Sequence, residues 1–247
     1  MNRLQNKTAV VTGGTTGIGF ETAKQFIDQG ATVIITGQNK ERLHTAAAAL
    51  GRAIPVQADV RSLTDLDTLA TQVEAHLGKL DILFANAGIG SFASLDTIDE
   101  AFYDNQFDIN VKGVFFTVQK LARLLNEGAS VILNASAVNE KGMAMGSVYF
   151  ATKAAVRSLA RSLAAELGER KIRVNAISPG LVMTNFQSKG MSPELIDGFA
   201  EYVTNAAPLR RLGQQEEIAS AVTFLASDQS SYMTAADLVV DGGFMNV

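Results

Sequence analysis

The chain has 247 residues, of which 47% are hydrophobic and 19% are charged, with a formal net charge of −4. This composition is typical of a globular protein with a substantial core, and it gives no sign of intrinsic disorder. The charge is mild and the basic residues form no long run, which argues against a nucleic acid or an anionic membrane as partner. Because the chain has no cysteine, disulfides, thiolate nucleophiles and cysteine-bound metals are excluded.

The only two histidines, His44 and His76, lie in polar, helix-like stretches, and neither has a second histidine nearby. We therefore expect structural or surface roles for both and no metal site. The first ten residues lack the apolar core of a signal peptide, and no run of about 18 apolar residues occurs. We expect a soluble cytoplasmic protein.

Short β-branched runs alternate with longer helical patterns along the chain. The runs are continuously apolar, which is typical of strands in a parallel sheet that helices cover on both faces. Seven strands are predicted, at Thr8–Gly13, Thr32–Thr36, Ala53–Ala58, Leu80–Ala85, Ser130–Ser136, Ile172–Ser178 and Asp237–Gly242. Helices are predicted between them at Ile18–Gln29, Lys40–Leu50, Ser62–Leu77, Ile98–Asn126 and Val148–Arg170.

This repeated alternation predicts an α/β protein with a doubly wound, Rossmann-like fold and a seven-stranded parallel sheet. No linker or low-complexity tract divides the chain, so we expect residues 1–247 to form a single NAD(P)-binding domain. The least regular long stretch, residues 180–213, holds two proline-marked turns and a short helix. Such an excursion at the carboxyl end of a strand is typical of a substrate loop, with a plain connection as the alternative.

The segment "TGGTTGIG", residues 12–19, follows the first predicted strand and opens the first helix. Its glycines allow a tight turn and a close approach to a diphosphate, whose charge the helix N-terminus stabilises. The spacing is neither that of a P-loop nor GxGxxG. A tight connection is the alternative, but at the first strand–helix turn we favour dinucleotide binding. The predicted cofactor residues here are Gly13, Thr15, Thr16, Gly17, Ile18 and Gly19.

The end of the second predicted strand bears on the choice between NAD and NADP. An acidic residue about 20 positions after the loop would bind the ribose 2′-hydroxyl, but Gly37 and Gln38 stand there. Lys40 or Arg42 offers positive charge for a 2′-phosphate, so NADP(H) is predicted to be preferred, with NAD(H) possible. As the alternative, both are solvated charges of a first helical turn. Gln38, Asn39 and Lys40 belong to the predicted cofactor site.

Asp59 and Val60 follow the third predicted strand. The Asp59 carboxylate is placed to reach the amino group of the adenine ring, and both residues are included in the predicted cofactor site. A helix N-cap is the competing role for Asp59.

Further motifs follow in a fixed order: "ANAG" at residues 85–88, "DIN" ending at Asn110, "NASAV" containing Ser136, "YFATK" at 149–153, "SPG" at 178–180 and "VDGG" at 240–243. Together with the glycine-rich loop they cover the whole chain, which resembles the short-chain dehydrogenase/reductase family. One departure is Ala85, where the family usually has a second asparagine that supports the loop by hydrogen bonding. We expect a small effect.

The resemblance implies further cofactor contacts in two of these motifs. In "ANAG" they are Asn86, Ala87 and Gly88. In "SPGLVMT", a segment that resembles the one orienting the nicotinamide carboxamide, they are Pro179, Gly180, Val182 and Thr184. A simple turn is the alternative for the Pro-Gly pair.

Tyr149 and Lys153 lie four residues apart, on one face of a predicted helix. A free phenol has a pKa of about 10, and we expect the ammonium group to lower it by about 3 units, which requires about 4 kcal/mol. The resemblance implies that Lys153 also binds the nicotinamide ribose, that Ser136 holds the substrate oxygen, and that Asn110 anchors a water linking Lys153 to solvent. The predicted reaction is hydride transfer to a carbonyl carbon, with Tyr149 giving the oxygen its proton, or the reverse.

Each of these four residues also has a plain structural alternative. Tyr149 could be a packed aromatic and Lys153 a surface charge. Ser136 could cap a strand end, and Asn110 could form a hydrogen bond within a helix. The candidate substrate wall is apolar, and methionines adapt to irregular shapes, which favours a bulky or varied hydrophobic ketone. Besides Ser136 and Tyr149, the predicted substrate residues are Val138, Met143, Met145, Phe92 and Phe186, with Met191 as a further candidate. Core packing is the alternative for each.

A general carbonyl reductase or secondary-alcohol dehydrogenase is therefore the first functional hypothesis. The runner-up, a 3-oxoacyl-[acyl-carrier-protein] reductase, needs a basic docking surface, to which Arg170 and Lys171 contribute only in part and which Glu127 opposes. A sugar or polyol dehydrogenase is disfavoured by the apolar wall. A non-catalytic NADP-binding regulatory protein is disfavoured because Tyr149 and Lys153 are both present.

The resemblance also implies a homotetramer, with Ile98–Asn126, Val148–Arg170 and the C-terminal strand forming the contacts. The apolar tail "FMNV" after Gly243 is expected to be buried against a neighbouring subunit. A dimer is the alternative.

Overall fold

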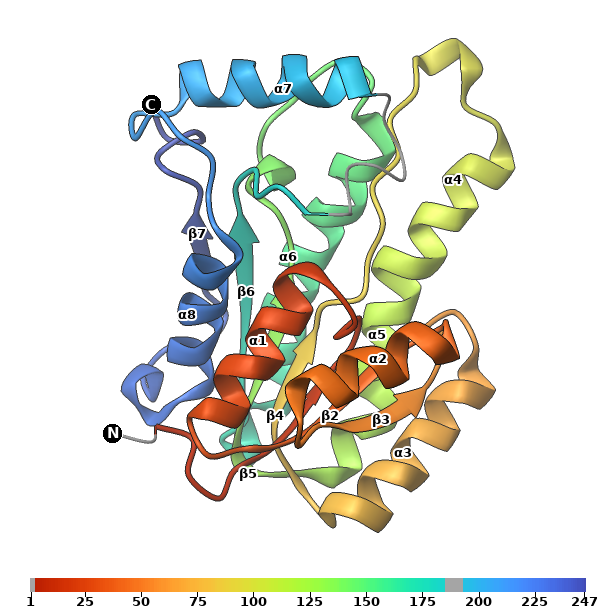
Figure 1. The fold of residues 1–247 in the computed structure, drawn as a ribbon, viewed down its shortest axis with the longest axis vertical. Coiled ribbons are helices and arrows are strands. Elements are labelled where there is room, and N and C mark those ends of the chain that lie inside the picture. Colours follow the sequence, from red (N-terminus) through yellow and green to blue (C-terminus); the bar gives the residue numbers. More distant parts are fainter. Residues whose placement is uncertain (1–2, 185–192) are drawn as a thin grey trace.

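In the computed structural model, which describes residues 3–184 and 193–247, one parallel sheet runs through the protein (Figure 1). Its seven strands lie in the order β3-β2-β1-β4-β5-β6-β7. The predicted seven-stranded parallel sheet is thus confirmed. The strands are β1 Thr8–Val11, β2 Thr32–Gly37, β3 Ile54–Gln57, β4 Leu80–Ala85, β5 Leu125–Asn134, β6 Arg173–Pro179 and β7 Asp237–Val240.

Helices cover both faces of the sheet. The bounds are α1 Gly17–Asp28, α2 Lys40–Leu50, α3 Leu63–Leu77, α4 Glu100–Phe107, α5 Gly113–Leu121, α6 Ser147–Leu167, α7 Pro193–Ala206 and α8 Gln215–Ala226. Apolar side chains of α3, α5 and α6 form one core, and those of α1, α2 and α8 form the other. Both faces of the strands are therefore buried, which explains their continuously apolar sequences.

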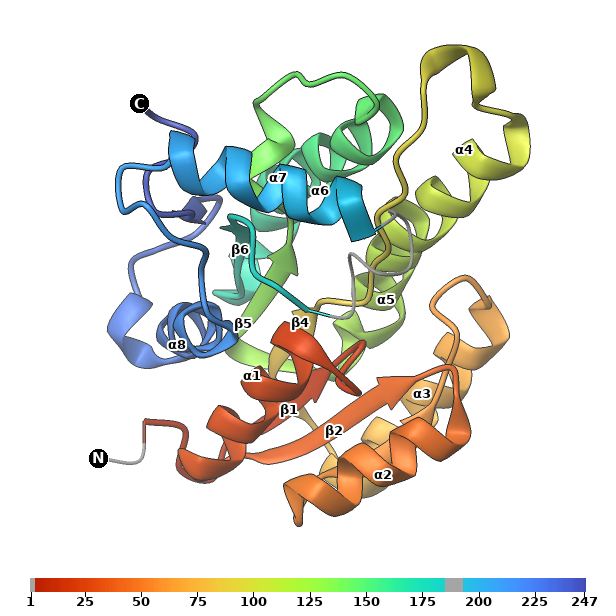
Figure 2. The ribbon, with the colours of Figure 1, turned by 45° about the horizontal axis from the view of Figure 1, so that its top comes forward.

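Strand order reverses between β1 and β4, because β1 pairs with β2 on one side and with β4 on the other. A ligand crevice forms at such a switch point, outside the carboxyl ends of the strands. Helix α7 crosses the molecule at this end, above the tips of β6 and β7 (Figures 1 and 2). The topology thus determines where a site lies before any side chain is considered.

The predicted helix Ile98–Asn126 is wrong as a single element. Helices α4 and α5 are separated by a π-helical turn at Asp108–Lys112, and β5 begins at Leu125. The first part of β5 pairs only at Leu125, and regular pairing with β4 resumes at Ser130, the residue where the sequence predicts the strand to start. The π-helical turn directs Asn110 into the protein interior, where the residue is 1% exposed.

Two further helices differ from expectation. The short helix expected within residues 180–213 is α7, which has 14 residues. Helix α8 was not predicted, although Gln214 and Glu217 form a capping box at its start. None of the described helices is both long and apolar enough to cross a membrane.

Candidate functional site

A cavity of about 470 Å³ opens at the carboxyl ends of the central strands. It extends from the glycine-rich turn after β1 to the start of α6, so it brings together motifs that are more than 130 residues apart. Of the predicted cofactor residues, the cavity is lined by Gly13, Thr15, Thr16, Gly17, Ile18, Gly19, Gln38, Val60, Asn86, Ala87, Gly88, Tyr149, Lys153, Pro179, Gly180, Val182 and Thr184. Asn39, Lys40 and Asp59 do not line it.

The glycine-rich turn is built so that only glycine fits at its key positions. Gly13 and Gly17 have φ angles of 66° and 61°, a region that side chains disfavour. A Cβ at Gly19 would lie 2.4 Å from the Gly13 carbonyl oxygen. The N-cap of α1, Thr16, makes no side-chain capping bond, and the first turn holds no acidic residue. The first N–H groups of α1 are thus available to an anion, and this turn fits a dinucleotide diphosphate.

Asn86 fixes this turn against the end of β4. Its Nδ2 donates to the main-chain oxygens of Thr12 (2.9 Å) and Gly13 (3.3 Å). The Thr12 hydroxyl in turn accepts the backbone N–H groups of Asn86 and Ala87. The "ANAG" motif therefore shapes the turn, and no second asparagine at Ala85, which is buried in the core, is needed for these bonds.

Two arginines lie at the far end of the cavity. Arg42, in the first turn of α2, and Arg61, after β3, both line it beside Gln38. The side chain of Asn39 accepts the backbone N–H of Arg42 as the N-cap of α2. Of the two cations considered for a 2′-phosphate, the structure therefore brings Arg42, rather than Lys40, to the cavity.

Asp59 is held by Arg61 in a salt bridge of 2.6 Å. This bond lowers the pKa of the Asp59 carboxyl below its ordinary value, and Gln38 contributes in the same direction. The N-cap role considered for Asp59 is wrong, because Ser62 caps α3 by accepting the backbone N–H of Asp65. Asp59 therefore positions Arg61 at the cavity edge.

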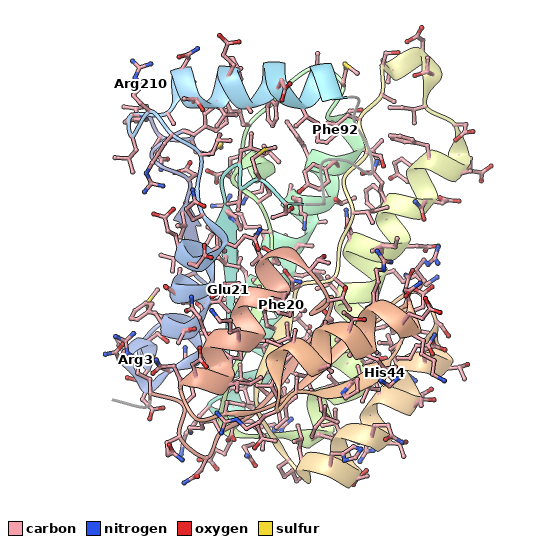
Figure 3. All side chains as sticks on the ribbon, in the orientation of Figure 1. Arg3, Phe20, Glu21, His44, Phe92 and Arg210 are labelled. Carbon is pink, nitrogen blue, oxygen red and sulfur yellow. The ribbon has the colours of Figure 1, made fainter. Side chains whose placement is uncertain are left out.

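Ser136 and Tyr149 meet at the inner end of the cavity, from the end of β5 and the first turn of α6. Their side chains are hydrogen-bonded, and Tyr149 is 8% exposed. Phe92, labelled in Figure 3, packs against the Tyr149 ring with a centroid distance of 5.5 Å. The phenol thus faces the cavity with a serine hydroxyl beside it and an aromatic ring behind it.

Lys153 lies one turn along α6 and is 4% exposed. Its ammonium donates to the main-chain oxygen of Asn134 at 2.8 Å and lies 5.8 Å from the centroid of the Tyr149 ring. The Asn134 side chain donates to Asn86 Oδ1 at 2.9 Å. A chain of hydrogen bonds therefore joins the lysine to the glycine-rich turn. Asn134 was not among the predicted site residues, although it stands in the "NASAV" motif.

Burial acts on both of these titratable groups. Desolvation raises the pKa of Tyr149 to about 12, against a smaller lowering by the bond from Ser136. Desolvation lowers the pKa of Lys153 to about 8. The expected lowering of the phenol pKa by Lys153 is wrong for the polypeptide by itself, because desolvation of the phenolate is the larger effect here.

Asn110, in the π-helical turn, is anchored to the segment after β4. Its Oδ1 accepts the N–H of Ile89 at 2.9 Å, and its Nδ2 donates to the Ile89 oxygen at 2.8 Å and to Thr152 Oγ1 at 3.1 Å. It does not line the cavity. The structure places it against the helix that carries Tyr149 and Lys153, and its link to a water remains a prediction.

Known proteins resemble this chain over its full length. A family model described as enoyl-(acyl carrier protein) reductase matches residues 13–245. Oxidoreductase asL5 of Sarocladium schorii is 43% identical, over 100% of this chain and 99% of that protein. The chain belongs to the short-chain dehydrogenase/reductase family. A 3α-hydroxysteroid dehydrogenase of Mediterraneibacter gnavus is 39% identical over 97% of each chain.

The fold agrees with this assignment to the short-chain dehydrogenase/reductase family. A short-chain type dehydrogenase/reductase from Mycobacterium marinum superposes with a TM-score of 0.92 at 32% identity, over 100% of this chain and 98% of that one. The chain is thus an oxidoreductase with a Rossmann-like fold, and members of its family bind NAD(P)(H).

Beyond Tyr149, the wall of the short-chain dehydrogenase/reductase site is apolar. Of the predicted substrate residues, Phe92, Ser136 and Val138 line the cavity. Met143 and Met145 do not line it and are 37% and 42% exposed. Phe186 and Met191 lie outside the described residues. Further apolar residues of this wall, which sequence reasoning missed, are Leu181, Phe199, Val203 and Phe244.

Phe244 belongs to the tail that was expected to pack on a neighbouring subunit. Instead it is 4% exposed within its own chain and lines the cavity. Gly242 and Gly243 turn the chain back with φ angles of 67° and 90°, and Asp241 accepts the backbone N–H groups of Gly243 and Met245. Phe244 is thus part of the cavity wall, and the double glycine was the signal for it, while the packing of the remaining tail residues on a neighbouring subunit remains a prediction.

His44 is exposed on α2 (Figure 3), and His76 is exposed on α3. In residues 3–184 and 193–247, no group of three or more side chains from His, Cys, Asp and Glu is arranged to hold a metal ion.

Proposed function

We propose that this protein is an NADP(H)-dependent carbonyl reductase, or secondary-alcohol dehydrogenase, for bulky apolar substrates. The observation that carries the proposal is that the Tyr149 phenol, with Ser136 at its side, lies in the cavity that runs from the glycine-rich turn to the ring of Phe92. In this proposal residues 1–247 form one domain, and residues 180–213 supply the substrate loop.

The residues present fit a dinucleotide. The open N-terminus of α1 and the positive φ angles of Gly13 and Gly17 suit its diphosphate. Asn134 Oδ1 is buried and has no hydrogen-bond partner within the described part of the chain, so it is open to a donor in the cavity. When bound, the nicotinamide supplies or accepts the hydride.

In the reduction, Tyr149 donates its proton to the carbonyl oxygen as that oxygen gains negative charge. Ser136 donates a hydrogen bond to the same oxygen and thereby holds it beside the phenol. The Lys153 ammonium stabilises the resulting phenolate, and it binds the nicotinamide ribose in the role that the family resemblance implies. In alcohol oxidation, Tyr149 takes the proton back.

Two arginines support the preference for NADP(H). Arg42 and Arg61 line the end of the cavity where the adenosine ribose would lie, and Gly37 and Gln38 place no carboxylate there. Guanidinium groups bind phosphate strongly. Because Asp59 neutralises Arg61, we expect Arg42 to be the main contact for a 2′-phosphate.

The substrate class is supported by the wall and by a relative. Phe92, Phe199 and Phe244 face the same cavity as the phenol, and such a lining favours large hydrophobic ketones over sugars and polyols. One relative is named a 3α-hydroxysteroid dehydrogenase, which acts on a substrate of this kind.

An acyl-carrier-protein substrate has less support. Lys171 forms an ion pair with Glu127, and the Arg170 guanidinium donates to the main-chain oxygens of Ala122 and Leu125. Both cations are thus engaged within the chain, which weakens the basic surface that an acidic carrier would need. A homotetramer, which the family resemblance implies, and a cytoplasmic location, which the sequence predicts, are both kept as expectations.

A panel of carbonyl compounds with both nucleotides tests the proposal. We expect kcat/KM to be highest for bulky alicyclic or aromatic ketones, to be lower for small ketones and to be negligible for ketoses, and we expect a lower KM for NADPH than for NADH. The measurement is the loss of nicotinamide absorbance. A preference for a ketose or an acylated carrier would contradict the proposed substrate class, and a clear preference for NADH would contradict the proposed role of Arg42.

The pKa values predict a pH dependence for the reduction. Tyr149, with its pKa raised to about 12, stays protonated as the acid throughout the neutral range. Lys153, with its pKa lowered to about 8, is charged below that pH and neutral above it. We therefore expect kcat/KM for reduction, which reports ionisations of the enzyme before the substrate binds, to be constant at neutral pH and to fall above about pH 8. In the Lys153→Arg variant the guanidinium keeps its charge, so the decrease in the reduction rate above about pH 8 should disappear. If the pH profile of this variant matched that of the wild type, the decrease would come from another group.

A further inference from the structure

We propose that Asp237 is a positioning residue for the reaction, which fixes the turn after Ser136 against the segment at Pro179. This inference rests on the proposed function, because it concerns the same catalytic residues. Asp237 is the first residue of β7 and does not line the cavity. It acts through its neighbours.

The Asp237 carboxylate is shared by three side chains. Its Oδ1 accepts the Ser178 hydroxyl at 2.6 Å. Its Oδ2 accepts Asn139 Nδ2 at 3.1 Å and lies 3.0 Å from Arg157 Nε. Asn139 Nδ2 also donates to the Ser178 oxygen at 2.8 Å, which closes a ring of polar contacts.

Each of these side chains belongs to a segment that carries a residue of the site. Asn139 ends the 3-10 turn that begins directly after Ser136. Ser178 precedes Pro179 at the end of β6. Arg157 follows Lys153 by four residues on α6 and therefore lies on the same side of that helix. The Asp237 carboxylate thus connects three segments of the site. They are the turn that follows Ser136, the end of β6 that precedes Pro179, and the part of α6 that carries Lys153.

The surroundings make this a stiff connection. Ser178 is fully buried and the Asp237 side chain is 11% exposed. Hydrogen bonds to a carboxylate are stronger than those between neutral groups. The bonds from Ser178 and Asn139 are of this kind, and the charge of Arg157 adds an ion pair to the same carboxylate. Within the 3-10 turn itself, the backbone N–H of Asn139 donates to the Ser136 oxygen, so this bond does not tie the turn to another segment.

The test is the variant Asp237→Asn, which keeps the shape of the side chain but removes its charge. The new amide group would also place an N–H donor opposite the donors of Asn139 and Arg157. We expect kcat for ketone reduction to fall on the order of 10- to 100-fold, as for a small displacement of a reacting group. The Kd for NADPH should change by less than about twofold, because the diphosphate turn is built by β1, α1 and Asn86.

A double-mutant cycle with Ser136→Ala separates positioning from general stability. If Asp237 acts through Ser136, the double variant should be no slower than Ser136→Ala alone. Additive losses, or a kcat for Asp237→Asn equal to that of the wild type, would overturn the proposal. Glu140→Gln is the matched control, since it removes the exposed second ion pair of Arg157 and should leave kcat unchanged.

Hydrogen–deuterium exchange of the NADPH-bound protein gives a readout that does not need turnover. Asp237→Asn should increase the exchange rate of the backbone N–H of Asn139, and Glu140→Gln should not. Unchanged exchange at Asn139 in a folded Asp237→Asn variant would overturn the inference. If wild-type protein reduces no ketone while exchange still rises, the proposed function fails and the positioning role stands. Ser178→Ala, which deletes one arm of the network, serves the same comparison if Asp237→Asn does not fold.

Discussion

Tyr149→Phe is expected to lower kcat for ketone reduction by roughly 10²- to 10⁴-fold, the range that general acid catalysis contributes. The variant keeps the aromatic ring that packs on Phe92 and removes only the hydroxyl. Folding and the Kd for NADPH should therefore be nearly unchanged, while the carbonyl oxygen loses its proton donor. Steady-state kinetics and nucleotide fluorescence titration measure the two quantities separately.

Tyr232→Phe is the matched control. Its side chain is fully exposed, so removal of its hydroxyl should leave kcat at the wild-type value. Should Tyr149→Phe instead retain full activity on a good ketone, Tyr149 would not be the acid. A loss in both variants would point to an effect other than proton transfer.

Gly19→Ala is expected to weaken NADPH binding by about 100-fold, equivalent to about 2.8 kcal/mol. The added Cβ would lie 2.4 Å from the Gly13 oxygen and 2.5 Å from Asn86 Nδ2, distances that force the turn or the first turn of α1 to move. Gly13 and Asn86 shape the glycine-rich turn, so the displacement also moves the N–H groups that a diphosphate needs. Fluorescence titration of NADPH gives the Kd.

Gly168→Ala is the control for this substitution. Gly168 has a φ of −62°, and a Cβ there would meet no atom within 4 Å. Its Kd should match that of the wild type. Circular dichroism should show that Gly19→Ala is folded at the titration temperature, and a folded Gly19→Ala protein with wild-type affinity would show that this turn does not hold the diphosphate.

The strands were predictable because both of their faces are buried, and this burial is visible in the sequence as short apolar runs. Leu80–Ala85 is apolar at every position but one, and Thr32–Gly37 is centred on the buried run Val33–Ile35, since helices cover both faces of the sheet. The glycine-rich turn was predictable because its positive φ angles at Gly13 and Gly17 require residues without a side chain. These features depend on local sequence.

Features that depend on tertiary packing were not predictable. The π-helical turn at Asp108–Lys112 leaves no break in the helical pattern, and Asn110 turns inward to satisfy the main chain of Ile89. Phe244 reaches the cavity only because the chain turns back at Gly242 and Gly243 and packs the ring against Val203 of α7. The pKa of Tyr149 depends on how deeply the phenol is buried, which the spacing to Lys153 does not reveal.

The path of the hydride tests the central claim most directly. Wild-type protein is incubated with a bulky ketone and NADPH that carries deuterium at both C4 positions of the nicotinamide, and the alcohol product is analysed by mass spectrometry and NMR. We predict one deuterium on the carbinol carbon and an ordinary, exchangeable hydrogen on the oxygen. An alcohol without deuterium on carbon, or a failure to form alcohol from any ketone of the panel, would contradict hydride transfer in this cavity with Tyr149 as the proton donor.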